Sequence, residues 1–168
     1  MENTKYLLLK FANHNKYCNL KMLNIIQTNI SNAWNYELAG KYFKSLGEIL
    51  DHIYVTENNW MKYLLKCSQA HITLDIELNI IDHNKMHFSE VQTFLSEREI
   101  LDNLIIQFFS SVKEEFLIEK EAKEISGSFV PWEPVIHLFN HQAHHRGQIS
   151  HILDEIGIEN DYSSIITI

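Results

Sequence analysis

The residues of this sequence best suited to chemistry are its histidines. There are ten, and four of them lie close together, at positions 137, 141, 144 and 145. His141 and His145 are four residues apart, a spacing that on an α-helix places both side chains on one face, with Cβ atoms about 6 Å apart. Two imidazoles so placed can bind one metal ion. The pattern therefore predicts a metal site, and it leaves open the alternative of a histidine-rich face within an ordinary core.

The apolar residues of the same segment, residues 135–156, indicate which histidines face inward. Counted at 100° per residue from His141, the apolar side chains point to about 75–80°. His145 lies roughly 40° from that direction and His141 roughly 80°, whereas His137 and His144 both lie beyond about 110°. We therefore expect His145 to face the core, His141 to flank it, and the other two to face outward or line a neighbouring cleft.

A third ligand has to come from another helix, and His52 is the best candidate. It lies in a second helical segment, roughly 100° from the centre of that segment's apolar stripe, so it flanks the core as His141 does. Three neutral imidazoles leave at least one coordination position open, which is typical of a catalytic rather than a structural metal site. The remaining histidines are isolated and are predicted to be surface or ordinary polar residues: His14, His71, His83, His87 and His151.

The motifs of several other enzyme classes are absent from the sequence. Gln142 stands where the glutamate of an HExxH motif would be, so a metalloprotease of that type would lack its general base. There is also no P-loop, no GxGxxG, no GxSxG and no CxxC pair. The two cysteines, Cys18 and Cys67, are a weak disulfide signal in 168 residues without a signal peptide. We expect both to be buried thiols of a cytoplasmic protein.

Charge and hydropathy argue against two kinds of partner. Lys and Arg total 14 against 22 Asp and Glu, a net charge of −8, and only two arginines occur. Such a surface repels a nucleic-acid phosphate backbone. The longest apolar run near the start, Leu7 to Leu9, is far too short to span a membrane. We therefore expect neither nucleic acid nor a membrane as partner.

Four long amphipathic helices are expected to position the histidines. Their predicted ranges are about residues 5–28, 45–67, 89–116 and 133–157. Ser45, with Glu48 three residues later, forms a capping box at the start of the second helix. The first helix has an imperfect stripe, which consists of Tyr6, Leu9, Phe11, Tyr17, Leu20, Leu23 and Ile26.

The segments between these helices differ in length. Residues 68–86 are predicted to form a long, partly ordered connection, and such long loops are often functional. Residues 120–132, with Gly127 and Pro131, are predicted to form a loop or a short extended pair. Because each apolar stripe must be buried against another, the expected fold is an all-α four-helix bundle, with one domain spanning residues 1–168.

Two blocks of the sequence resemble the DinB family. One is the run HLFNHQAHHRGQI, residues 137–149, which is closely similar to the C-terminal signature of that family. The other is residues 42–60, in which His52 is followed five residues later by Glu57 and then by Trp60. The resemblance covers essentially the whole chain, with a looser fit in the first and third helices.

This resemblance implies a four-helix bundle that binds a divalent metal, commonly zinc or nickel, through three histidines and often forms a homodimer. Carried over to this sequence, the ligands are His52, His141 and His145, the same residues that the helix geometry favours. The family takes its name from damage-inducible expression and is related to enzymes that transfer low-molecular-weight thiols. It therefore implies a metal-dependent thiol S-transferase as the activity.

On this interpretation, a metal-bound thiol attacks a small electrophile held at the mouth of the bundle. Trp60, Trp132 and Phe139 either form walls of the site or pack in the core. Arg146 either holds a carboxylate of the thiol cofactor or forms a surface salt bridge. Glu57 is either a hydrogen-bond partner of a metal-binding histidine or a solvated surface residue. Two alternative functions stay open: a metal-dependent hydrolase, and a stress-response protein that binds metal without catalysis.

Overall fold

The elements of this chain are helical throughout the part that the structure describes. The computed structural model describes residues 2–68, 78–118, 130 and 132–166. Its elements, in chain order, are α1 (Glu2–Asn29), the short 3₁₀ helix η1 (Ala33–Asn35), α2 (Leu46–Ser68), α3 (Val91–Ser111), α4 (Glu114–Ile118) and α5 (Trp132–Glu155). These residues contain no strand, so the prediction of an all-α fold is confirmed. None of their helices is both long and apolar enough to cross a membrane.

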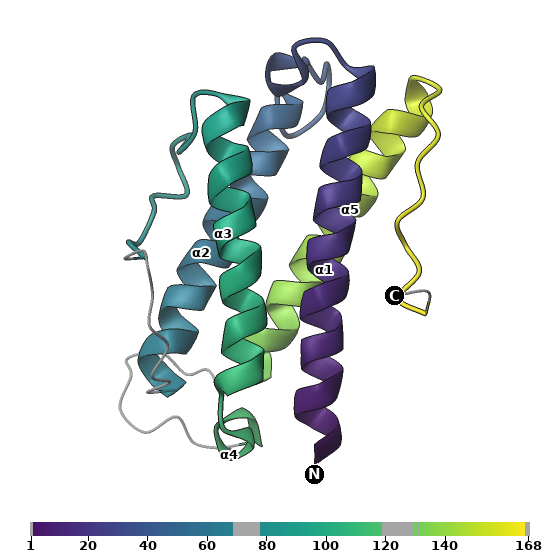
Figure 1. The fold of residues 1–168 in the computed structure, drawn as a ribbon. Helices are drawn as coiled ribbons and strands as arrows, with labels where there is room; N and C mark the ends of the chain where they lie inside the picture. The colour runs from purple at the N-terminus through teal and green to yellow at the C-terminus, as the bar shows by residue number, and fades with distance from the viewer. Residues whose placement is uncertain (1, 69–77, 119–129, 131, 167–168) are drawn as a thin grey trace.

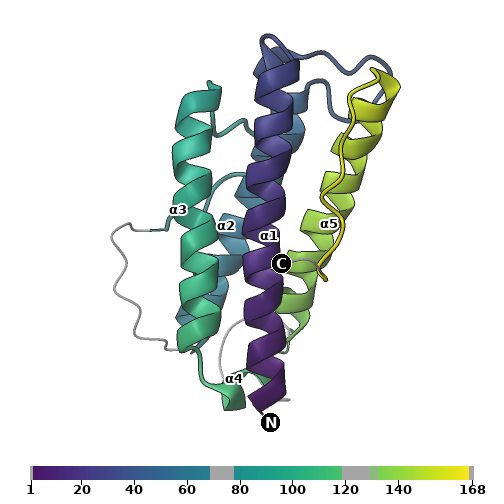
Figure 2. The same cartoon turned by 45° about the vertical axis from the view of Figure 1, so that its right-hand side comes forward.

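The four long helices form a bundle in which α1 and α2 lie diagonally opposite each other. α1 packs mainly against α3 and α5, and α2 packs against the same two helices. Figures 1 and 2 show that α1 and α5 run in one direction and α2 and α3 in the other. Because α2 and α3 are parallel, the chain has to return along the bundle between them, which explains the long connection. Residues 69–77 of that connection, and residues 119–129 and 131 of the next loop, lie outside the described residues.

Local hydrogen bonding explains where the two histidine-bearing helices begin or end. The Ser45 hydroxyl accepts the N–H of Glu48 at 3.1 Å, and the Glu48 carboxylate accepts the N–H of Lys44 at 2.7 Å. The capping residues predicted for the second helix are therefore confirmed. α5 stops just before Gly157, which adopts a φ of +72°, a left-handed conformation that favours glycine.

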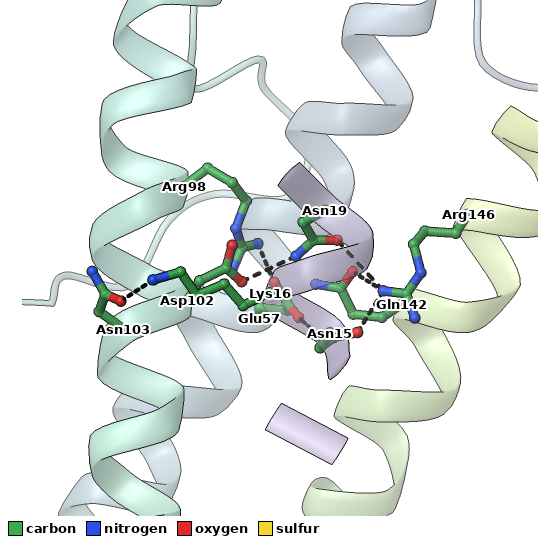
Figure 3. Close-up of polar contacts among 9 residues, drawn as sticks. All are labelled: Asn15, Lys16, Asn19, Glu57, Arg98, Asp102, Asn103, Gln142 and Arg146. Atoms are coloured by element: carbon green, nitrogen blue, oxygen red, sulfur yellow. Dashed lines mark hydrogen bonds and ion pairs between the residues drawn. The ribbon is translucent and has the colours of Figure 1, made fainter. Parts of the chain in front are cut away.

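The buried face of α1 differs from the stripe predicted for it. Four members of that stripe are exposed: Tyr6, Phe11, Tyr17 and Leu20. In contrast, Asn15 and Asn19 are only 2% exposed and point into the bundle (Figure 3). The predicted stripe is therefore partly wrong, because hydrogen-bond partners on other helices allow these amide side chains to be buried.

The third predicted helix, residues 89–116, is divided in the structure. α3 ends at Ser111, Val112 is extended with φ −60° and ψ 141°, and α4 begins at Glu114. The break turns the chain so that α4 packs against α1 and buries Leu117. The predicted single helix is therefore wrong at its C-terminal end, where packing of α4 against α1 buries an apolar side chain.

Trp34 anchors the segment between α1 and α2 to the core. Its indole ring is buried against Phe88 and Phe94, with ring centroids 6.4 and 5.4 Å away. Gly47 lies against it, and a Cβ atom there would come within 2.4 Å of the Trp34 carbonyl oxygen. Glycine is required by this close approach. The first turn of α2 is thus held against the segment that also carries Phe43.

Candidate metal centre

Three histidines from two antiparallel helices meet at one point. The Nε2 atom of His141 lies 3.1 Å from Nε2 of His52 and 3.0 Å from Nε2 of His145. One ligand atom from each of the three lies within 4.8 Å of the other two. His52 belongs to α2, whereas His141 and His145 occupy successive turns of α5. The structure therefore brings together the three residues that the sequence predicts as ligands.

The exposure of the α5 histidines follows the helix geometry. His145 is 6% exposed, His141 is partly buried, and His137 and His144 are exposed, as expected from the apolar stripe. The His144 ring lies 4.9 Å from that of His145, and the His137 ring lies 5.4 Å from that of His141. The two exposed histidines therefore border the cluster on either side of its α5 ligands.

The spacing of the three nitrogens suits a small divalent ion. With metal–nitrogen bonds of about 2.0–2.1 Å, two ligands of a tetrahedral ion lie about 3.3 Å apart. The distances from His141 Nε2 to Nε2 of His52 and of His145 are within a few tenths of an ångström of that value. A set of three imidazoles is compatible with zinc, nickel, copper or iron, because geometry and availability rather than ligand type select among them. The donor set thus fits a divalent metal with an open coordination position.

Burial keeps the cluster uncharged. Removal from water, reinforced by His145 and His83, lowers the pKa of His52 to about 4. Removal from water and the neighbouring histidines lower the pKa of His141 to about 3, and burial also lowers that of His145. Neutral imidazole is the form that binds a metal, so protons compete weakly for this cluster at neutral pH.

The outer nitrogens of two of these histidines differ in their contacts. His145 Nδ1 donates to Oε1 of Gln148 at 2.7 Å. This bond keeps the proton on Nδ1 and leaves the lone pair of Nε2 facing the other histidines. His141 Nδ1 is buried without a hydrogen-bond partner among the described residues. Sequence reasoning missed Gln148, although its position one helical turn after His145 is the spacing at which such a contact forms.

The histidine cluster opens into a cleft of about 730 Å³. Segments far apart in the sequence line it, namely Tyr42 and Phe43 before α2, residues 83–86 of the connection, and His144 and Gln148 of α5. The Phe43 ring lies 5.2 Å from that of His52 and 5.7 Å from that of His145. The long connection, which the sequence analysis singled out as often functional, therefore forms part of the cleft. His83, predicted to be an ordinary polar residue, is one of its contributions.

The charged residues of the cleft are not equally available. Asp51 is buried and accepts the backbone N–H groups of His87 and Phe88 at 3.0 and 2.8 Å, and Glu48 caps the start of α2. Lys85 carries an exposed ammonium group, 3.4 Å from the Asp82 carboxylate of its own loop. A negatively charged ligand would therefore find Lys85 at this cleft, while the two carboxylates are committed to the backbone.

A second cluster, the central polar network, lies inside the bundle (Figure 3). All four long helices contribute to it: Asn15 and Asn19 of α1, Glu57 of α2, Arg98 and Asp102 of α3, and Gln142 and Arg146 of α5. Arg98 pairs with Glu57 and donates to Asp102 Oδ1 at 2.8 Å. Burial alone would lower the pKa of Arg98, but the two carboxylates more than offset it and raise that pKa. Burial raises the pKa of Glu57 to about 7, although the Arg98 guanidinium opposes that rise.

Arg146 and Trp60, the predicted cofactor-binding residues, are not brought to the histidine cluster. Arg146 is buried and donates to Asn15 Oδ1 and, at 3.0 Å, to Gln142 Oε1 in the central polar network. Trp60 packs against His137, with ring centroids 5.6 Å apart. It lies about two helical turns after His52, the predicted ligand on α2. Among the described residues that line the cleft, neither of these side chains occurs.

Several other predicted positions need correction. Glu57 is buried in the central polar network, so it is neither in solvent nor beside a ligand. Phe139 packs against two other phenylalanines, which agrees with the core-packing alternative rather than with a wall of the site, and Trp132 is exposed at the start of α5. His14, predicted to be a surface or ordinary polar residue, is buried one turn before Cys18 on α1, with its ring 3.3 Å from the thiol sulfur. Cys18 is buried as predicted, whereas the second cysteine, at position 67, is only half-buried.

Comparison with known proteins identifies a family. The family model described as DinB family matches residues 1–162 of the 168 residues. No curated protein and no solved structure gives a significant match. The matched range includes both helices that carry the histidine cluster, and the bundle is all-helical as the resemblance implies. This chain therefore belongs to the DinB family.

Proposed function

We propose that this protein binds a divalent metal ion, zinc or nickel, through His52, His141 and His145, and uses it to transfer a low-molecular-weight thiol to a small electrophile. The observation that carries the proposal is the convergence of three Nε2 atoms beside an open cleft. A structural zinc site has four protein ligands, whereas three leave a position for an exogenous ligand. The bound metal would supply the charge that lowers the pKa of a coordinated thiol.

Residues around the cluster support this role. The hydrogen bond from His145 to Gln148 orients one ligand, and the Phe43 ring covers part of the cluster. Lys85 lines the cleft, and in this proposal it pairs with a carboxylate of the thiol. Arg146 was predicted for this role from the sequence. Arg146 is already bonded within the central polar network, so Lys85 takes its place in the proposal.

The hydrogen bonds that the nearby carboxylates already accept favour thiol transfer over hydrolysis. A metal-dependent hydrolase commonly uses a carboxylate as general base. Glu48 and Asp51 line the cleft, but both accept backbone N–H groups that hold the loops around the site in place. A thiol, which ionises far more easily than water, depends less on such a base.

The first experiment measures metal content by elemental mass spectrometry on dialysed protein purified without a histidine tag. We expect near-stoichiometric metal in the wild type and its loss in His52→Ala, His141→Ala and His145→Ala. His144→Ala is the matched control, because this exposed neighbour is not one of the three convergent histidines. A wild-type protein that holds no metal, even after zinc or nickel is resupplied, would contradict the proposal.

The second experiment separates the three candidate functions. Metal-loaded protein is incubated with a chromogenic aryl halide or ester, with and without glutathione or cysteine. Thiol-dependent loss of the aryl halide, abolished in His145→Ala, supports the transferase. Ester cleavage without thiol would support the hydrolase instead, and stable metal binding without either reaction would support a non-catalytic stress-response protein.

We also propose that the protein acts as a homodimer in the cytoplasm. Large apolar side chains are exposed on α1, among them Tyr6, Tyr17 and Leu20. A two-fold partner would cover such a face. Sedimentation velocity across micromolar concentrations tests the assembly, and a monomer at every concentration would contradict it.

A further inference from the structure

An apolar hollow adjoins the cleft beside the three histidines. It has a volume of about 250 Å³. Its buried lining consists of Leu38, Ile49 and Ile152, each at most 6% exposed. Tyr42, Phe43 and Gln148 line both the hollow and the cleft. The two spaces are therefore neighbours, and residues 42–43 together with Gln148 form their common wall.

The positions of the lining residues along the helices show how near the hollow lies to the histidines. On α2, Ile49 precedes His52 by three residues, and on α5, Ile152 follows Gln148 by four. One helical turn advances about 5.4 Å. The hollow is thus one to two turns from the cluster, within reach of a short substituent on a molecule held there.

The polar residues at the rim of the hollow are engaged with one another. Lys41 lies 3.0 Å from the Glu155 carboxylate, and His151 lies 3.4 Å from the same carboxylate oxygen. The surface that lines the hollow is mainly apolar and offers water few hydrogen bonds, so displacement of water by an apolar group is favourable. An apolar cavity of about 150 Å³ is large enough for benzene, so this hollow accommodates a phenyl group or a short alkyl chain.

We propose that the hollow binds an apolar substituent of the electrophile, so that the substrate class is amphipathic: a polar reactive head at the histidine cluster and an aryl or short alkyl group in the hollow. This inference rests on the proposed function, because the head has to be held at the metal. It also assigns a specificity role to Leu38, Ile49 and Ile152, which otherwise are ordinary core residues.

The test uses zinc-loaded protein and two hydroxamates that share a metal-binding head, acetohydroxamate and hexanohydroxamate. Affinities are measured by calorimetry after the zinc content has been verified by elemental mass spectrometry. Each fully buried methylene raises affinity about fourfold. With partial burial of the four added methylenes, we expect hexanohydroxamate to bind at least about tenfold more tightly to the wild type.

Two variants, Ile152→Phe and Leu38→Phe, fill the hollow from different sides. If one of them fails to fold, the other still tests the apolar subsite. The matched control is Ile136→Phe, which adds the same ring at a 57% exposed position of the same helix. We expect the filled variants to bind acetohydroxamate as the wild type does but to lose most of the preference for the longer chain, and the control to keep it.

The outcomes distinguish this inference from the proposed function. Equal affinity for both hydroxamates in the wild type, or an undiminished preference in the filled variants, would overturn the apolar subsite and leave the metal centre intact. A wild-type protein that binds no zinc would overturn both. Loss of the preference in the filled variants alone supports the subsite.

Discussion

The two polar clusters inside this bundle differ in the charge of their side chains. In the central polar network, Arg98 pairs with both Glu57 and Asp102, and Arg146 donates to the amide oxygens of Asn15 and Gln142. In the histidine cluster, three ring nitrogens approach one another, and burial lowers the pKa of each histidine, so the cluster carries no charge at neutral pH. The comparison indicates that the network holds groups of opposite charge within the chain, whereas the donor set of the histidine cluster fits a divalent cation.

Helix α5 takes part in both clusters. Gln142 and Arg146 directly follow His141 and His145 in the sequence, and a rotation of 100° per residue turns them to the adjacent helix face. The hydrogen bonds of Arg146 to Asn15 and Asn19 of α1 therefore fix the rotation of α5 about its axis. That rotation also sets the direction of the two histidines, so the network serves as the scaffold of the candidate metal centre.

The largest effect is expected from breaking the central polar network. Arg98→Leu removes the guanidinium that pairs with the buried carboxyl groups of Glu57 and Asp102, which should reduce the free energy of unfolding by about 3–5 kcal/mol in urea denaturation. Lys41→Ala removes one partner of the exposed Lys41–Glu155 pair and should cost at most about 1 kcal/mol. A loss for Arg98→Leu no larger than that of the control would show that the network is dispensable.

Binding of zinc to the histidine cluster should have the next largest effect on the free energy of unfolding. Zinc at about 100 times its dissociation constant is expected to raise the free energy of unfolding by about 2.7 kcal/mol, because it binds only the folded chain. Urea denaturation with zinc and with a chelator measures the difference. The same gain in His52→Ala would place the stabilising ion elsewhere on the protein.

Loss of the Gln148 contact should weaken metal binding without removing a ligand. Gln148→Leu deprives His145 Nδ1 of its acceptor, and we expect about 10–100-fold weaker zinc affinity in chelator competition. Gln148→Glu keeps an acceptor and should retain the affinity. Because urea stability of the metal-free protein reports structural damage separately, equal affinities in wild type and Gln148→Leu would refute the orienting role.

In the metal-free protein, we expect the free energy of unfolding to fall gradually as the pH falls, and the change for each pH unit is the smallest of the four effects. The pKa values of His52 and His141 lie at about 4 and about 3 in the folded chain, below the usual value of 6.5. Between the folded and the unfolded pKa values, the unfolded chain binds protons that the folded chain does not bind. The contribution of these histidines to the free energy of unfolding is therefore fully present above pH 6.5 and decreases as the pH falls toward 4. Each histidine contributes at most about 1.4 kcal/mol per pH unit. His141→Leu should show a shallower decline, and an unchanged slope would contradict the assignment.

The sequence by itself determined the all-α class and the three convergent histidines. The pairing of His141 with His145 is a local property, because spacing and the apolar phase of one helix decide it. The flank position of His52 follows from its own helix in the same way. The capping of α2 by Ser45 is also local, since its hydrogen bonds join residues three or four apart.

Only the tertiary structure decided which polar residues lie inside. Asn15 and Arg146 are 131 positions apart in the chain and bond in the centre of the bundle, so no local pattern reveals that either is buried. For the same reason the stripe of α1 was misassigned, and Arg146 was predicted at the cofactor rather than in the network. The walls of the cleft, such as Phe43 and Lys85, come from loops whose positions depend on how the helices pack. Burial of a polar group depends on a distant partner, and that partner is present only when the chain is folded.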